Sequence, residues 1–196
     1  MTTQKPSRRG RPRSFDPEQA IAVAQRLFHA HGYDAVSVAD VTEALGINPP
    51  SFYAAFGSKA GLYARVLDRY TVTDAIPFSD LLRPDRPVAE GLASLLEEAA
   101  RHYAADPVTT GCLVLEGTRS NDPDARKAAC AFYAAVEDMI RAYIAARHPE
   151  EAERLTDFVG TVMAGLSARA RNGHGLVRLL ATARLASLTL VQALPA

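Results

Sequence analysis

Apolar residues recur at every third or fourth position along most of this chain, which is the spacing of an amphipathic helix. Alternating β-branched runs are nearly absent, apart from the short stretch DAVSVAD. Glycine and proline interrupt the pattern and give approximate helix ends. We therefore expect an all-α fold. The predicted helices span residues 17–31, 38–45, 49–56, 59–70, 87–105, 110–118, 123–147, 150–171 and 175–193.

The first four predicted helices begin with recognisable caps. Asp16-Pro17 and Asn48-Pro49 each combine an N-cap residue with proline at the first helical position, and Ser37 and Ser58 are the other two expected caps. Further along, AIPFSDLLRPDRP contains three prolines and is typical of a linker. We expect three parts: a flexible arm at 1–15, an N-terminal unit at 16–70 and a C-terminal helical unit at 71–196.

Charge is balanced overall but not along the chain. The 196 residues are 48% hydrophobic and 22% charged, with zero formal net charge. Residues 1–70 contain nine Lys and Arg against six Asp and Glu, whereas the remainder contains thirteen against sixteen. Five basic residues lie in the N-terminal arm, where they predict a polyanionic partner. They are Lys5, Arg8, Arg9, Arg11 and Arg13.

The two cysteines cannot form a metal cluster or a disulfide scaffold, which indicates a reducing compartment. No apolar segment follows the basic N-terminus as a secretion signal would require. No uninterrupted apolar run approaches the roughly 18 residues of a membrane helix. We expect a soluble cytoplasmic protein with no metal, cofactor or membrane association.

The stretch SVADVTEALGINPPSFYAAF matches two short helices joined by a glycine turn, the helix-turn-helix pattern. The second helix is a candidate reader of the DNA major groove, with Phe52 and Phe56 anchored in the core. Tyr53 faces outward, where its hydroxyl can reach a phosphate, and Lys59 adds a cation nearby. The alternative is an ordinary helical hairpin with an aromatic core.

The run AQRLFHAHGYDAVSVADVTEALGINPPSFYAAFGSKAGLY, about residues 24–63, resembles the TetR-type transcriptional repressors. Weaker similarities are GCLVLEG and, as in AcrR-like members, GLSARARNGHGLVRLLATARLA. The resemblance implies a three-helix DNA-binding domain followed by a helical domain that binds a small molecule and dimerises. It also implies that the effector moves the two DNA-binding heads apart and releases a palindromic operator.

Several DNA-binding roles follow from this resemblance. Ser37 and Tyr53 correspond to phosphate contacts, and Lys59 to a cation on the phosphate side. Ala54 and Ala55 depart from the Tyr and His that many members carry, which reduces the hydrogen-bonding reach of the helix. The base-facing stretch comprises Asn48, Pro49, Pro50, Ser51 and Ala54.

Arg9-Gly10-Arg11-Pro12 resembles the core of an AT-hook, which inserts arginine into a narrow A·T minor groove. With Arg13, these arginines are predicted DNA contacts. The alternative is a solvated, disordered tail. A related alternative for the whole protein is an architectural protein that binds A·T-rich DNA through the arm.

The last two predicted helices carry apolar residues at helical spacing, and two such helices from each subunit would make a four-helix dimer interface. The alternative is that they close a monomeric core. The predicted interface residues are Phe158, Val162, Leu166, Leu179, Ala183, Ala186 and Leu190.

The middle helices supply candidate walls for an effector pocket, although plain core is the more common role for each such residue. A largely apolar wall suits a hydrophobic effector. The candidates are Tyr103, Cys112, Glu116, Phe132, Tyr133, Met139 and Tyr143.

Other chemistry is weakly indicated. His102 lies four residues from both Glu98 and Asp106, but a solvated face explains this spacing better than a metal site. Cys112 has no basic neighbour in sequence, which favours an inert thiol over an oxidant sensor. An enzyme on a helical bundle is the other alternative, but we find no phosphate loop, no His-Glu-x-x-His and no catalytic residue. Gly165-Leu166-Ser167 has no strand leading into it, as a nucleophile elbow requires.

Overall fold

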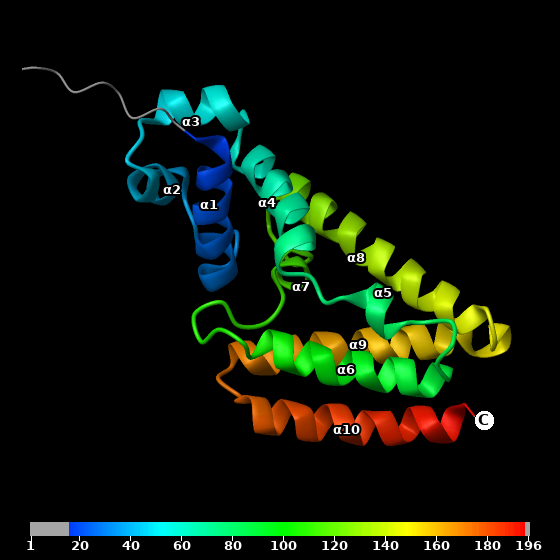
Figure 1. The fold of residues 1–196 in the computed structure, drawn as a ribbon. Coiled ribbons are helices and arrows are strands. Elements are labelled where there is room, and N and C mark those ends of the chain that lie inside the picture. Colours follow the sequence, from blue (N-terminus) through cyan, green and yellow to red (C-terminus); the bar gives the residue numbers. More distant parts are fainter. Residues whose placement is uncertain (1–15, 195–196) are drawn as a thin grey trace, which may run out of the picture.

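The computed structural model describes residues 16–194, and every regular element in that range is a helix. Four helices form a head at one end of the molecule (Figure 1). These are α1 (Pro17–His31), α2 (Val38–Leu45), α3 (Pro49–Phe56) and α4 (Lys59–Thr73). The remaining helices form a longer body: α5 (Phe78–Leu81), α6 (Val88–Tyr103), α7 (Leu113–Gly117), α8 (Pro123–Ala145), η1 (Pro149–Glu151), α9 (Ala152–Arg171) and α10 (Leu176–Ala193).

The four predicted caps of the head are confirmed. The Asp16 carboxylate accepts from the Glu18 amide at 3.0 Å, and the Asn48 side-chain oxygen accepts from the Ser51 amide at 2.9 Å. Ser37 and Ser58 cap α2 and α4 in the same way. Each cap satisfies a backbone N–H that has no partner inside its helix, so these helix starts are determined locally.

The predicted linker is partly helical. Helix α4 continues to Thr73, and the short helix α5 lies inside the proline-rich stretch. Phe78 and Leu81 of α5 pack against the core of the body. Four residues cannot form a stable helix alone, so tertiary packing holds α5 in place.

The described residues bury two hydrophobic clusters, and neither belongs to one sequence segment. The head cluster contains Phe28, Phe52 and Tyr63, but it also contains Leu113 of α7 and Ala129 of α8. The body cluster is built by α6, α9 and α10, with contributions from the 76–82 segment and α8. Helices α7 and α8 therefore join the head to the body through a shared core.

Hydrogen bonds reinforce this connection. The Tyr33 hydroxyl donates to the Asp122 carboxylate at 2.8 Å, and the Ser120 hydroxyl donates to Asp34 at 2.8 Å. The Asn121 amide also donates to Asp34, at 2.9 Å. The turn between α1 and α2 is thus fixed on the turn that precedes α8.

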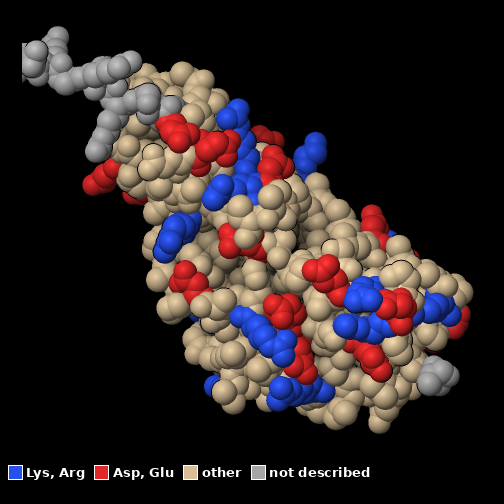
Figure 2. Space-filling view, in the orientation of Figure 1, with Lys and Arg blue, Asp and Glu red and all other residues tan. Residues whose placement is uncertain are grey.

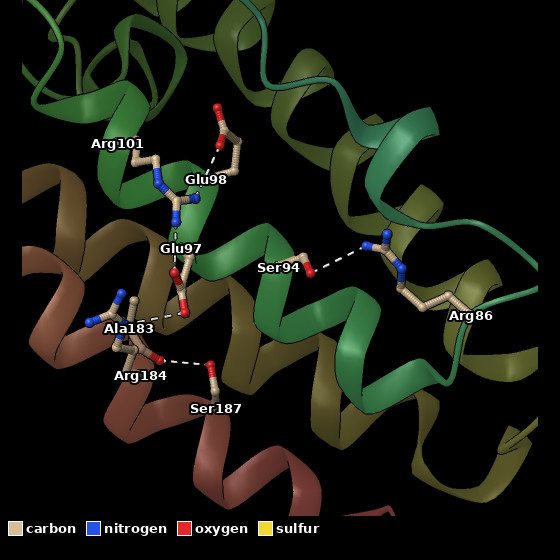
Figure 3. Close-up of polar contacts among 8 residues, drawn as sticks. All are labelled: Arg86, Ser94, Glu97, Glu98, Arg101, Ala183, Arg184 and Ser187. Atoms are coloured by element: carbon tan, nitrogen blue, oxygen red, sulfur yellow. Dashed lines mark hydrogen bonds and ion pairs between the residues drawn. The ribbon is translucent and has the colours of Figure 1, made fainter.

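Helix α10 lies along α6 on the outside of the body (Figure 1). Figure 3 shows the polar contacts at the edge of the α6–α10 pair. The Glu97 carboxylate forms ion pairs with Arg101 of its own helix at 2.7 Å and with Arg184 of α10 at 3.4 Å. Exposed ion pairs of this kind contribute at most about 1 kcal/mol each. The burial of apolar α10 residues against α6 is the larger stabilising term.

Candidate nucleic-acid interface and effector cavity

Helices α2 and α3 form the predicted helix-turn-helix. The Ser37 hydroxyl accepts from the Asp40 amide at 3.1 Å, while the Asp40 carboxylate accepts from the Ser37 amide at 2.7 Å. This reciprocal capping box fixes the start of α2. Gly46, with φ of +64°, adopts the left-handed conformation that reverses the chain before α3.

Helix α3 has two distinct faces. Phe52 is fully buried and Phe56 is 7% exposed, so both rings anchor the helix in the head core. The Tyr53 ring packs edge-on against Phe52, with ring centres 5.3 Å apart, but it lies on the outer side of the helix and is 51% exposed. Ser51 is half-buried, and the remaining outward residues are Asn48, Pro49, Pro50 and Ala54. The predicted orientation of this helix is confirmed, with a rigid, solvent-facing N-terminal end.

Lys59 has a structural role that the sequence did not reveal. Its ammonium donates to the backbone carbonyls of Tyr33 at 3.0 Å and Val36 at 2.9 Å. It also lies 4.0 Å from the centre of the Tyr33 ring, within cation–π distance. Lys59 therefore joins the start of α4 to the turn between α1 and α2, and its predicted phosphate contact stays a prediction.

The described head carries little positive charge of its own. Helix α3 has no charged residue, and the tip of the head is tan in Figure 2. Residues 16–70 contain four Lys and Arg against six Asp and Glu. The basic excess of residues 1–70 comes from the arm at 1–15. The predicted contacts Arg9, Arg11 and Arg13 belong to this arm and lie outside the described residues.

A cavity of about 90 Å³ lies in the body beside α4. Helices α4 to α9 all contribute to its wall, which is mainly apolar and aromatic. One water needs roughly 10–15 Å³ by the same measure, so the cavity can hold a small organic molecule. Its lining residues are Tyr70, Thr71, Ala75, Ile76, Phe78, Tyr103, Cys112, Val114, Leu115, Phe132, Tyr133, Val136, Glu137, Ile140, Gly160 and Met163.

Four of the seven predicted pocket residues line this cavity: Tyr103, Cys112, Phe132 and Tyr133. The other three, Glu116, Met139 and Tyr143, do not line it.

Each of these three has a different environment. Glu116 pairs with Arg171 at 3.3 Å. Met139 is 47% exposed on α8. The Tyr143 hydroxyl donates to the Arg86 carbonyl at 3.4 Å and packs against Gly91 of α6. Spacing along α8 could not show which side of that long helix faces the cavity, because α8 contacts neighbours along its whole length.

Cys112 has the environment of an inert thiol. Desolvation raises the pKa of its thiol, so the thiol form dominates at neutral pH. The Tyr70 hydroxyl donates to the sulfur at 3.8 Å, and the Cys112 amide donates to the Ser167 hydroxyl at 2.9 Å.

A second, polar cleft of about 190 Å³ lies between α1 of the head and the end of α6 in the body. Its lining includes His29 of α1, His102 of α6 and Asp74 after α4. The His29 Nε2–H donates to the Gly111 carbonyl at 3.2 Å, and Arg171 donates to the His29 carbonyl at 3.0 Å. Burial lowers the pKa of both His29 and His102, which keeps the two rings neutral near pH 7.

The predicted dimer face requires a correction. Leu166, Leu179, Ala183 and Leu190 are each no more than 1% exposed, because they pack in the core of their own chain. They are not available to a second subunit. Phe158, Val162 and Ala186 are half-buried.

The outward face of α10 instead carries large apolar side chains that the prediction missed. Val177, Leu185, Leu188 and Val191 are between 59% and 83% exposed. An exposed apolar stripe of this size marks an interaction surface. Both sides of α10 are apolar, so periodicity alone could not distinguish the core side from the outer side.

Two other sequence expectations concern membranes and metals. Helix α10 is long and apolar enough to pass a length-and-composition test for a membrane span. However, it contains Arg178 and Arg184 and packs along α6, as the helices of a protein core do. Between residues 16 and 194, no group of three His, Cys, Asp or Glu residues is placed to hold a metal ion.

Comparisons with known proteins identify the family. Residues 20–66 match the model of the bacterial regulatory proteins of the tetR family. The HTH-type transcriptional repressor BdcR of Escherichia coli (strain K12) is 59% identical over 187 residues, 95% of each chain. The HTH-type transcriptional repressor ComR of the same strain is 30% identical and matches 88% of this chain and 87% of its own.

Solved structures agree. A cysteine mutant of the TetR family regulator CifR, complexed with 26-bp double-strand operator DNA, superposes with a TM-score of 0.81 at 33% identity. The match covers 95% of this chain and 100% of that one. Together with the helix-turn-helix geometry, these findings show that this chain belongs to the tetR family of bacterial regulatory proteins.

Proposed function

We propose that two copies of this chain bind a palindromic DNA operator in the cytoplasm and repress transcription until a small molecule releases them. The outward face of α3 carries the proposal, because its aromatic residues are buried and its N-terminal end is open to solvent. The repressors BdcR and ComR and the operator complex of CifR support the same function. The chain is a regulator and not an enzyme.

The physical argument for DNA reading rests on shape. The major groove is about 12 Å wide and accepts one helix. Pro49 and Pro50 stiffen the first turn of α3, where no N–H is required, so the helix enters the groove in one conformation. Asn48 and Ser51 then lie near base edges, with Ala54 contributing a methyl group. Tyr53 and the arm supply backbone contacts, and half-sites lie about 34 Å apart.

Helix α4 offers a mechanical link between effector and operator. Its first half packs Leu62 and Tyr63 in the head core, while Tyr70 near its other end lines the cavity. Gly57 and Ser58 connect its start directly to α3. A molecule that fills the cavity therefore shifts the helix that carries the DNA reader. Typical coupling of this kind is about 1–3 kcal/mol, or roughly 5–150-fold in operator affinity.

The decisive experiment is selection of bound DNA from a random pool with the full chain. A palindrome with half-sites one helical turn apart supports the proposal. Enrichment of A·T-rich sequences without a defined palindrome would support the architectural alternative instead.

The arm is tested by repeating the binding with a chain that lacks residues 1–13 over a range of salt concentrations. We expect lower affinity, chiefly at low salt, and a shallower salt dependence because fewer counterions are released. Identical salt curves for the two chains would exclude a role for the arm.

A further inference from the structure

The wall of the body cavity carries one carboxylate among aromatic rings. Glu137 of α8 lies beside Tyr133, and the ring side chains of Tyr70, Phe78, Tyr103 and Phe132 line the same cavity. The lining contains no Lys, Arg or His. The cavity is therefore apolar, rich in π-faces and negatively charged at one point.

Glu137 has no ion-pair partner within residues 16–194. Arg141 lies one turn along α8, but it pairs with Asp138 at 2.5 Å and Glu153 at 3.2 Å. Arg141 acts on Glu137 from one turn along α8, but the cavity lining itself offers the carboxylate no counter-charge. A cation in the cavity would supply one there.

Neighbouring residues hold the Glu137 carboxylate in a defined position. Burial and the hydrogen bond to Glu137 raise the pKa of Tyr133 to about 12, so its hydroxyl stays a donor to the carboxylate. Both groups lie against Gly160 of α9, where an added Cβ would come 3.0 Å from the Tyr133 hydroxyl and 3.5 Å from a Glu137 oxygen. Glycine at this position leaves room for the polar pair.

A second polar side chain lines the same space. Tyr103 is 1% exposed and belongs to the cavity wall. Its hydroxyl can both donate and accept a hydrogen bond, so it is a second polar group that a guest could contact.

We propose that the effector is a small organic cation, an aromatic or branched ammonium compound, whose charge is held by Glu137 and the surrounding aromatic rings. The proposal rests on the proposed function, since it names the class of molecule that the regulatory cavity accepts. The ammonium donates to the Glu137 carboxylate and lies against π-faces, which attract cations. The apolar part of the ligand fills the rest of the cavity.

The test compares three molecules of nearly equal size but different charge: benzylammonium, benzyl alcohol and benzoate. Binding to the full-length protein is measured by calorimetry at pH 7.5, and release of the selected operator by fluorescence anisotropy. We expect benzylammonium to bind at least about tenfold more tightly than benzyl alcohol, with benzoate weakest. At a concentration near its own dissociation constant, only benzylammonium should release the operator.

Glu137→Gln should lower the affinity for benzylammonium to that for benzyl alcohol and leave the affinity for benzyl alcohol within about twofold. Asp138→Asn is the matched control, because this neighbouring carboxylate is exposed and pairs with Arg141 outside the cavity. It should leave both affinities unchanged. Thermal unfolding of each variant shows that the fold is retained.

The proposal is overturned if the three molecules bind equally, if none binds, or if Glu137→Gln leaves the preference for the cation intact. Failure of the proposed function looks different, since the protein would then select no palindromic DNA even without any added molecule. A variant that retains operator binding but loses only the response to benzylammonium supports both the proposed function and the proposed class of effector.

Discussion

Helices α3 and α10 are both apolar and both leave one face exposed to solvent, yet the sequence was informative for only one of them. In α3, the two buried residues are phenylalanines four positions apart, and the outward residues are polar, small or proline. In α10, leucine, valine and alanine lie on every side. The inward face of α10 was therefore mistaken for the outward one.

The difference between α3 and α10 shows when an amphipathic pattern can predict the buried face of a helix. A surface helix reveals its buried side when the other side is polar, as in α3. A helix that packs against its own core on one side and a second chain on the other shows no such contrast. For α10, only the positions of α6 and α9 determine that Leu179, Ala183 and Leu190 point inward.

The sharpest test of the α3 assignment is Phe52→Ala. The ring is fully buried, so we expect the free energy of unfolding to fall by about 3–5 kcal/mol in urea denaturation. Tyr53→Ala, one residue along on the exposed face, should cost less than about 1 kcal/mol. Similar losses for both variants would mean that α3 is oriented differently.

For α10, the corresponding test is Leu179→Ala. This side chain is 1% exposed, and its truncation should lower the free energy of unfolding by about 2–5 kcal/mol. Val177→Ala serves as the comparison, because Val177 is 83% exposed in the single chain and its truncation should change stability by roughly 0.5 kcal/mol. A larger loss for Val177 than for Leu179 would restore the original assignment of the faces.

The outer face of α10 can be tested directly with Leu188→Asp. A carboxylate placed in an apolar interface is strongly unfavourable, so the dissociation constant of the dimer should rise at least about tenfold in sedimentation equilibrium. Helix content by circular dichroism should be unchanged. Val108→Asp alters a similarly exposed apolar residue in the loop before α7 and should have no effect on assembly.

A smaller effect is expected for Tyr53→Phe. Loss of one hydrogen bond to a phosphate costs about 1.5 kcal/mol, or roughly tenfold in affinity. Because a phosphate contact carries no base information, binding to every sequence should weaken alike. Anisotropy titrations on a set of operator variants check this, and a changed order of preference among them would exclude the assigned role.

The smallest effect concerns the junction between head and body. Burial lowers the pKa of His29 below its ordinary value of 6.5, so below that pH the unfolded chain binds a proton that the folded chain resists. Stability should therefore be fully present above about pH 6.5 and should fall as the pH decreases further. His29→Gln should flatten the dependence measured by thermal unfolding between pH 7.5 and 5.5. His102 shifts in the same direction and leaves a residual slope.

Much of the head could be read from the sequence, because its determinants are local. The caps at Asp16, Ser37, Asn48 and Ser58 lie within three residues of the amides that they satisfy. Lys59 shows the limit of this reasoning. Its ammonium binds carbonyls 26 and 23 residues earlier in the chain, and no local signal predicts such contacts.

The cavity was only partly predictable. Tyr103, Cys112, Phe132 and Tyr133 were chosen as aromatic or polar residues of the middle helices, and they do meet. Glu137 was missed because a glutamate on a long amphipathic helix resembles any solvated charge. Its position four residues after Tyr133 was the available signal, since residues at this spacing share one face of a helix.

The sequence by itself determined which of the longer segments are helical, where most of them start, and which side of α3 is buried, whereas the short helix α5 inside the predicted linker depends on packing. These properties depend on dihedral preferences, caps and periodicity within one or two helical turns. The tertiary structure alone decided which face of α10 is free, which residues enclose the cavity, and that Glu137 is the one carboxylate in its lining. The physical reason is that burial and charge pairing depend on neighbours far away in the chain, and their identity is fixed only when the helices pack.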